Sequence, residues 1–196
     1  MTYPPAPWTM HGDMWLSLFR FRGVPDRPDG IYGAAWVSYR EPSPLTYGEL
    51  LVARLLKDEP GRPVRVTDIW VDSAPSREGG RALWAIPKDL CDFEREITRT
   101  GPLRRAHWQA RAGATPIAAA RFTDISRANL LRAPFRGATH QLREDGSPVT
   151  AALTGSARAL PARAAWDFHP DGPLGWLAGR RSIASFAMTD FAMSFG

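Results

Sequence analysis

The chain has 196 residues and a formal net charge of +5; hydrophobic residues make up 44% of it and charged residues 23%. These values are typical of one soluble globular domain and exclude a wholly disordered chain. No apolar run reaches the roughly 20 residues that span a bilayer, and the first ten residues lack the pattern of a secretory signal. We therefore expect one cytoplasmic domain over residues 1–196, without a membrane partner.

Twenty-five basic residues suggest an anionic partner, but they are scattered and form no basic run. Only two of them, Lys57 and Lys88, are lysines. A module that binds nucleic acid or another anion is therefore the least favoured class, and we expect no nucleic-acid partner.

Short runs rich in Val, Ile, Trp, Phe and Tyr lie between frequent glycines and prolines, as in β-strands. The predicted strands are 14–21, 31–39, 49–55, 64–72, 82–86, 106–111, 116–123, 149–157 and 182–195. The last of these carries apolar residues of both parities, which is typical of a strand that is central or bent between two packed layers.

Helical signals are weaker than strand signals. Residues 88–98 place Leu90, Phe93 and Ile97 on one side of a short helix, and residues 126–132 allow one or two helical turns. We therefore predict a mostly β fold with one or two short helices. Its sheet is expected to be an antiparallel barrel or a strongly bent sandwich.

The common catalytic and cofactor motifs are absent from the sequence. It has no glycine motif that binds a dinucleotide or a phosphate and no zinc-protease motif. It also lacks the nucleophile-elbow motif of α/β-hydrolases. The four histidines lie far apart, and the single cysteine, Cys91, excludes a disulfide framework and a cysteine-cluster metal site. We interpret Cys91 as a plain thiol, and we expect neither a metal nor an organic cofactor.

Two segments remain as candidates for chemistry. One is residues 79–88, which end in Pro87-Lys88, and the other is Tyr47-Gly48-Glu49. Taken alone, Lys88 also fits a solvated strand end and Glu49 a strand residue that faces solvent.

Together these segments resemble the acetoacetate decarboxylase family. Gly80-Arg81 through Pro87-Lys88-Asp89-Leu90 is similar to the family's Gly-Arg-Glu … Pro-Lys-Lys segment, and Tyr47-Gly48-Glu49 is similar to its Tyr-x-Glu element. The resemblance implies a β-rich double barrel or cone around an apolar cavity. It also implies that Lys88 is the Schiff-base lysine and Glu49 a catalytic-site glutamate, with Trp84 and Arg81 contacting substrate.

The implied activity is that of a lyase acting on a small keto acid or ketone, by decarboxylation or by aldolase-like or dehydratase-like chemistry. A neutral amine condenses with the carbonyl, and the resulting iminium draws electrons from the adjacent carbon while an acid or base moves protons. Such an amine needs a lowered pKa; acetoacetate decarboxylase itself is the standard example, with a desolvated lysine beside a second cation. The resemblance further implies a homo-oligomer.

The sequence departs from the family pattern in ways that affect both the amine and the substrate. Asp89 occupies the place of the second lysine and would favour the charged amine, unless an extended stretch 82–89 turns it to the opposite face from Lys88. Residues 10–14 replace a carboxylate-binding arginine, and residues 33–36 and Ala82 lack two glutamates. The sign of the Lys88 pKa shift stays open from sequence, and a changed substrate is expected.

An alternative function is therefore retained. In it, the chain is a β-barrel that binds a small apolar or carbonyl ligand without turnover, and the lysine and cavity are inherited features. Trapping of an imine on Lys88 but not on Lys57 separates this alternative from the lyase.

Overall fold

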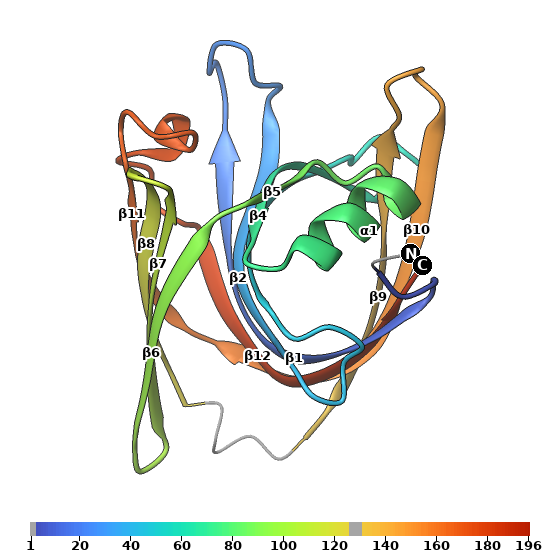
Figure 1. The fold of residues 1–196 in the computed structure, drawn as a ribbon. Helices are drawn as coiled ribbons and strands as arrows, with labels where there is room; N and C mark the ends of the chain where they lie inside the picture. Colours follow the sequence, from blue (N-terminus) through green and yellow to red (C-terminus); the bar gives the residue numbers. More distant parts are fainter. Residues whose placement is uncertain (1–2, 126–130) are drawn as a thin grey trace.

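Seven strands curve around a common interior and close into a barrel (Figure 1). The computed structural model describes residues 3–125 and 131–196. Around the barrel the strands follow the order β3 (Gly48–Leu55), β2 (Gly30–Arg40), β1 (Trp8–Phe21), β12 (Ala184–Phe195), β10 (Pro148–Pro161), β9 (Ala133–Leu142) and β4 (Val64–Val71). Antiparallel pairing of β4 with β3 closes the barrel.

One edge of β4 carries two partners that run parallel to it. β9 pairs with β4 at its first residue, Val64, opposite Thr139, and the short strand β5 (Lys88–Leu90) pairs with β4 from Ile69 onward. The sheet is therefore mixed rather than antiparallel throughout, which corrects that detail of the prediction. The mostly β barrel itself is confirmed.

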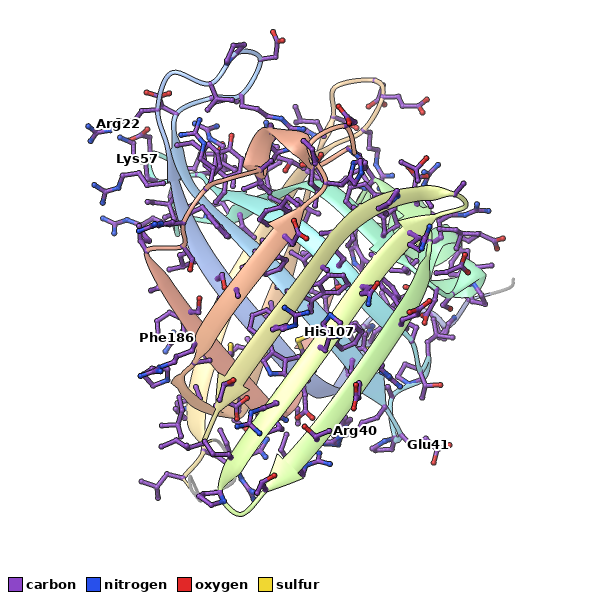
Figure 2. All side chains as sticks on the ribbon, turned by 90° about the vertical axis from the view of Figure 1, so that its left-hand side faces the viewer. Arg22, Arg40, Glu41, Lys57, His107 and Phe186 are labelled. Atoms are coloured by element: carbon purple, nitrogen blue, oxygen red, sulfur yellow. The ribbon has the colours of Figure 1, made fainter. Side chains whose placement is uncertain are left out.

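A second, antiparallel sheet packs against the outside of the barrel. It has the order β11 (Arg163–Phe168), β8 (Thr115–Asp124), β7 (Leu103–Ala112) and β6 (Asp92–Thr100). This sheet stands at the left of Figure 1 and faces the viewer in Figure 2. Large aromatic side chains fill the space between the two sheets: Trp15 and Trp36 from the barrel meet Trp108 and Phe122 from the second sheet.

The barrel strands that face the second sheet therefore have two apolar faces. On β1, Trp15 and Phe19 belong to the core between the sheets, whereas Met10 and Leu16 point into the barrel. Successive residues of a strand point to opposite faces, so one strand serves both layers. A 3₁₀ turn, Gly175–Leu177, adds Trp176 and Leu177 to the core between the sheets.

A bulge explains the mixed parity of the last strand. Opposite β1, Met188 pairs with Met14 and Phe191 pairs with Gly12, so that Thr189 and Asp190 together face the single residue between them. Asp190 has a φ of 51°, and its backbone N–H donates to Asp13 Oδ1 at 2.7 Å. Two residues against one reverse the alternation, so Met188 and Phe191 both pack in the barrel cluster.

Helix α1 (Ala74–Trp84) is the one α-helix among the described residues, and it lies across the barrel opening between β4 and β10 (Figure 1). Ser73 caps it by accepting a hydrogen bond from the Ser76 N–H, and Ala85 ends it in the left-handed conformation. No helix within the described ranges is long and apolar enough to cross a membrane.

Three sequence expectations need correction. The predicted strand 82–86 is the end of α1 and the loop after it, and the predicted helix 88–98 is β5 followed by β6. Phe93 and Ile97 do share one face, because a spacing of four residues satisfies a strand as well as a helix. The strands at 133–142 and 163–168 were not predicted, and most of the expected helix 126–132 lies outside the described residues.

Candidate active site

The amine of Lys88 is buried at the meeting point of three segments. Lys88 begins β5 and is 4% exposed. Its Nζ donates to Glu49 Oε2 at 2.8 Å, to Ser76 Oγ at 3.0 Å and to Tyr47 OH at 3.3 Å. Glu49 comes from β3 and Ser76 from α1, while Tyr47 directly precedes β3. The three donated hydrogen bonds satisfy the donor capacity of an ammonium group.

A glycine on α1 makes room for the lysine chain. A Cβ atom at Gly80 would lie 2.8 Å from Cδ and 2.9 Å from Cε of Lys88, closer than ordinary carbon contacts allow. The neighbouring Gly79 plays the same part toward Trp8, whose ring would lie 2.6 Å from a Cβ atom there. The pair of glycines therefore lets α1 approach both side chains closely.

Glu49 is held from its other side by Tyr39. The Tyr39 hydroxyl donates to Glu49 Oε1 at 3.1 Å, and the rings of Tyr39 and Tyr47 lie 4.5 Å apart. Glu49 is 4% exposed, so the carboxylate is buried with one oxygen on the tyrosine and the other on Lys88. This fixes the carboxylate beside the amine, in position to exchange a proton with it.

The electrostatics of this group favour the charged pair. Burial lowers the pKa of Lys88, but the Glu49 carboxylate and the Tyr47 hydroxyl outweigh burial, and the pKa of Lys88 is raised. Burial also raises the pKa of Tyr47, and burial together with Glu49 raises the pKa of Tyr39 well above its ordinary value. In the resting site Lys88 is therefore an ammonium, and both phenols keep their protons.

Lys88 lines a cavity of about 370 Å³ inside the barrel. Trp84, one of the residues expected to contact substrate, lines this cavity, with its ring 4.6 Å from that of Phe195. Lys88 and Glu49 line it as well. Most of the remaining wall is aliphatic or aromatic, and a concave apolar site with few polar groups is the usual form of a small-molecule site.

The other expected substrate contact, Arg81, does not line this cavity. Its Nε donates to the backbone carbonyl of Lys88 at 2.6 Å, and its Nη2 donates to the Asp89 carboxylate. Both side chains of this second pair are more than half exposed. Asp89 therefore faces away from the Lys88 amine, as an extended β5 requires, and Arg81 supports the backbone of the lysine rather than its amine.

Sequence reasoning missed three members of the group. Ser76 and Tyr39 received no role, and Tyr47 was noted as part of a motif without one. A signal existed for the tyrosines, because Tyr39 ends a predicted strand and Tyr47 starts the Tyr-x-Glu element. Nothing in the sequence marks Ser76, which reaches Lys88 only because α1 folds over the barrel opening.

Other reactive groups lie apart from this site. Cys91 is buried, and burial together with Asp72 and Asp92 raises its pKa to about 12, so the thiol is unreactive near neutral pH. Over residues 3–125 and 131–196, His, Cys, Asp and Glu side chains form no group of three or more that could hold a metal ion.

The fold agrees with the resemblance drawn from the sequence. No protein-family model and no curated protein matches the chain. Solved structures do match: an acetoacetate decarboxylase from Legionella pneumophila has a TM-score of 0.64 at 13% identity, over 99% of this chain and 86% of the other. The enduracididine biosynthesis enzyme MppR, complexed with pyruvate, has a TM-score of 0.68 at 16% identity, over 98% of this chain and 89% of the other.

An acetoacetate decarboxylase-like enzyme from Sphingomonas wittichii RW1 matches as well, with a TM-score of 0.60 at 14% identity, over 99% of this chain and 91% of the other. The identity is low throughout, so these matches establish the fold. The expected acetoacetate decarboxylase-like barrel is confirmed.

Proposed function

We propose that this chain is a divergent acetoacetate decarboxylase-like enzyme in which Lys88 forms a Schiff base with a small keto acid or ketone. The observation that supports the proposal most is a buried lysine amine, 2.8 Å from a buried carboxylate, at the end of an apolar cavity. A structural salt bridge needs no adjoining cavity, whereas a nucleophilic lysine needs room for its substrate.

Glu49 provides the proton acceptor that the amine requires. Transfer of one proton from Lys88 Nζ to Glu49 Oε2 gives a neutral amine and a carboxylic acid. The neutral pair is favoured when a substrate displaces water from the site, because a dry cavity penalises both charges. The amine then attacks the carbonyl carbon, and a carbinolamine forms.

The carbinolamine loses its hydroxyl as water after accepting the proton from Glu49, which leaves an iminium and a carboxylate again. The iminium accepts the electron pair of a bond to the adjacent carbon, so that either CO₂ or an α-proton leaves and an enamine forms. The hydroxyls of Tyr39 and Tyr47 keep their protons. They therefore serve as hydrogen-bond donors to the carboxylate and to the oxygen of the carbinolamine. Pyruvate is bound by the similar enzyme MppR, which supports a small carbonyl ligand here.

The second candidate is a binding protein without turnover. One observation favours it: Glu49 raises the pKa of Lys88, so the resting amine is charged and not nucleophilic. In that case the ion pair anchors a carbonyl ligand by hydrogen bonds alone. A homo-oligomeric state and a cytoplasmic location remain predictions under either function.

Reductive trapping decides between the two. The protein is incubated with acetone or pyruvate and cyanoborohydride, and the modified residue is located by peptide mass mapping. Lys57, exposed in the loop between β3 and β4 (Figure 2), is the internal control because it is the only other lysine of the chain. We expect an adduct on Lys88 alone, and none in Lys88→Met.

Equal, slow modification of both lysines, or none at Lys88 from neutral to mildly alkaline pH, would show that the chain does not form a Schiff base there. Binding of the same ketones without trapping, measured by calorimetry, would support the binding protein instead.

A further inference from the structure

The cavity that holds Lys88 Nζ continues far beyond the amine. Along β3, the alternate residues Glu49, Leu51, Ala53 and Leu55 all line it. Six residues of strand span roughly 20 Å at 3.3 Å per residue. Since Glu49 contacts Lys88, Leu55 marks the opposite end of the lining on this strand.

The same direction can be followed on the edge of β4. Lys88 pairs with Ile69, whereas Thr139, which also lines the cavity, pairs with Val64. Five residues of β4 separate the two positions, or roughly 16 Å of strand. The cavity is therefore elongated along the strands, with the reactive amine at one end.

Outside the Lys88 group, the described residues that line the cavity carry no charged side chain. Met10, Met14, Gly33 and Ala35 line it, and none of them carries a charged side chain. Apart from the indoles of Trp8 and Trp84, Thr139 is the one polar side chain that the described residues add to the lining outside the Tyr39, Tyr47, Glu49 and Lys88 group, and it is uncharged.

A carboxylate bound in this cavity would lack a cationic partner. Lys88 is the one cation among the described residues that line it, and its charge is matched by Glu49. An unpaired carboxylate in an apolar site carries a large desolvation cost. The lining therefore disfavours a keto acid and favours an uncharged ligand.

The two ends of the cavity differ in burial. Around the amine, the lining side chains Trp8, Tyr47, Ile69 and Trp84 are buried. Toward the other end, the lining side chains Leu18, Ile31, Leu55 and Val64 are half-buried. This second end lies near the loop that carries Lys57, opposite Arg40 and Glu41 in Figure 2. A ligand bound through its carbonyl at Lys88 therefore extends toward the Lys57 end.

The geometry points to an aliphatic ketone or aldehyde with an uncharged, unbranched chain of about ten carbon atoms as the substrate, an inference that rests on the proposed Schiff base at Lys88. The carbonyl lies at the amine, and the chain follows β3 toward Leu55. The amine adds to the carbonyl carbon, and one water leaves as the imine forms. A cavity of about 150 Å³ holds one benzene, so 370 Å³ has room for roughly ten to fifteen carbon atoms.

Chain length is the direct test. Methyl ketones from acetone to methyl undecyl ketone are compared by reductive trapping at Lys88 and by calorimetry, with pyruvate and acetoacetate as the charged short ligands. Each added methylene is expected to raise affinity about fourfold until the cavity is full, and the acids are expected to bind more weakly than ketones of equal length. Equal affinity across the series, or preference for the acids, would overturn the inference.

Two variants, each with leucine in place of an alanine, test where the aliphatic chain of the ligand lies. Ala53→Leu fills the cavity about four residues along β3 from Glu49, and it should shorten the best chain by about three carbons. Ala152→Leu makes the same substitution at an exposed position on β10, next to Leu153, which lines the cavity. This control should leave the preferred length unaltered. An unchanged optimum in Ala53→Leu would place the chain elsewhere and reject the inferred path.

Failure of this inference is distinguishable from failure of the proposed function. If long ketones bind with the expected length dependence but are never trapped, the Schiff base is wrong and the ligand class stands as that of a binding protein. If trapping at Lys88 is as efficient for acetone and pyruvate as for the long ketones, the Schiff base stands and the apolar chain is wrong.

Discussion

The variant Gly80→Ala should separate an effect on stability from an effect on the reactivity of Lys88. In Gly80→Ala the new methyl carbon would lie 2.8 and 2.9 Å from Cδ and Cε of Lys88, whereas carbon atoms in contact prefer about 3.5–4.0 Å. The lysine chain must therefore move by roughly 0.6–1 Å. Its Nζ is held by three hydrogen bonds to Glu49, Tyr47 and Ser76, and a shift of this size disturbs all of them.

The expected loss of stability is small. Overpacking costs about 1–3 kcal/mol, and replacing glycine by alanine inside a helix returns about 0.5–1 kcal/mol. The net decrease in the free energy of unfolding is about 0–2.5 kcal/mol, which for a chain of this size lowers Tm by at most about 10 °C. Misplacement of a reacting group by about 1 Å can cost on the order of 100-fold in rate, so imine trapping at Lys88 should fall at least tenfold.

The matched control is Gly79→Ala, whose methyl group would meet Trp8 rather than Lys88. Thermal unfolding followed by tryptophan fluorescence gives Tm, and the rate of reductive trapping is measured on the same samples. We expect a similar loss of Tm in both variants and a large loss of trapping in Gly80→Ala alone. Trapping at the unsubstituted rate in Gly80→Ala would refute the argument that Gly80 positions the amine.

Three further outcomes are expected. Glu49→Gln removes the carboxylate that contributes most to raising the pKa of Lys88, so the pH at which trapping becomes half-maximal should fall while the maximal rate drops about 100-fold; an unchanged pH profile would remove Glu49 from the mechanism. Cys91, with its pKa raised to about 12, should react with iodoacetamide at neutral pH only after unfolding in urea, and fast reaction in the folded protein would contradict its burial. Thr139→Val removes a buried hydroxyl that has no hydrogen-bond partner among the described residues, so urea unfolding should show a gain of about 1 kcal/mol; a loss would reveal a missed partner.

The β-rich architecture could be predicted because strand composition is local. Runs such as 31–39 and 64–72 lie close to the observed β2 and β4. The helix could not be predicted in the same way. Gly79 and Gly80 have poor helix propensity, yet they are required in α1 because Trp8 and Lys88 occupy the space of their missing side chains. Tertiary contact outweighs local preference at that point.

The sequence singles out both charged members of the candidate site, and the structure brings Lys88 and Glu49 to hydrogen-bonding distance although 39 residues separate them. The direction of the Lys88 pKa shift could not be read from the sequence. It depends on the balance between burial and a carboxylate from another strand, and both are products of barrel closure. The position of Arg81 could not be predicted either. Arg81 lies in the segment that resembles the family, yet its side chain donates to the backbone carbonyl of Lys88 and does not line the cavity.

One face of β1 and β2 packs against the second sheet, and the other lines the cavity. This arrangement determines which substitutions the fold tolerates. Trp15, Trp36 and Trp108 pack in the core between the sheets, whereas the side chains inside the barrel surround a cavity of about 370 Å³. We therefore expect substitutions such as Ala53→Leu to change the space inside the cavity without contacting the aromatic layer between the sheets. Because the main aromatic core lies outside the cavity, we expect single substitutions in the cavity wall to change ligand preference at little cost in stability.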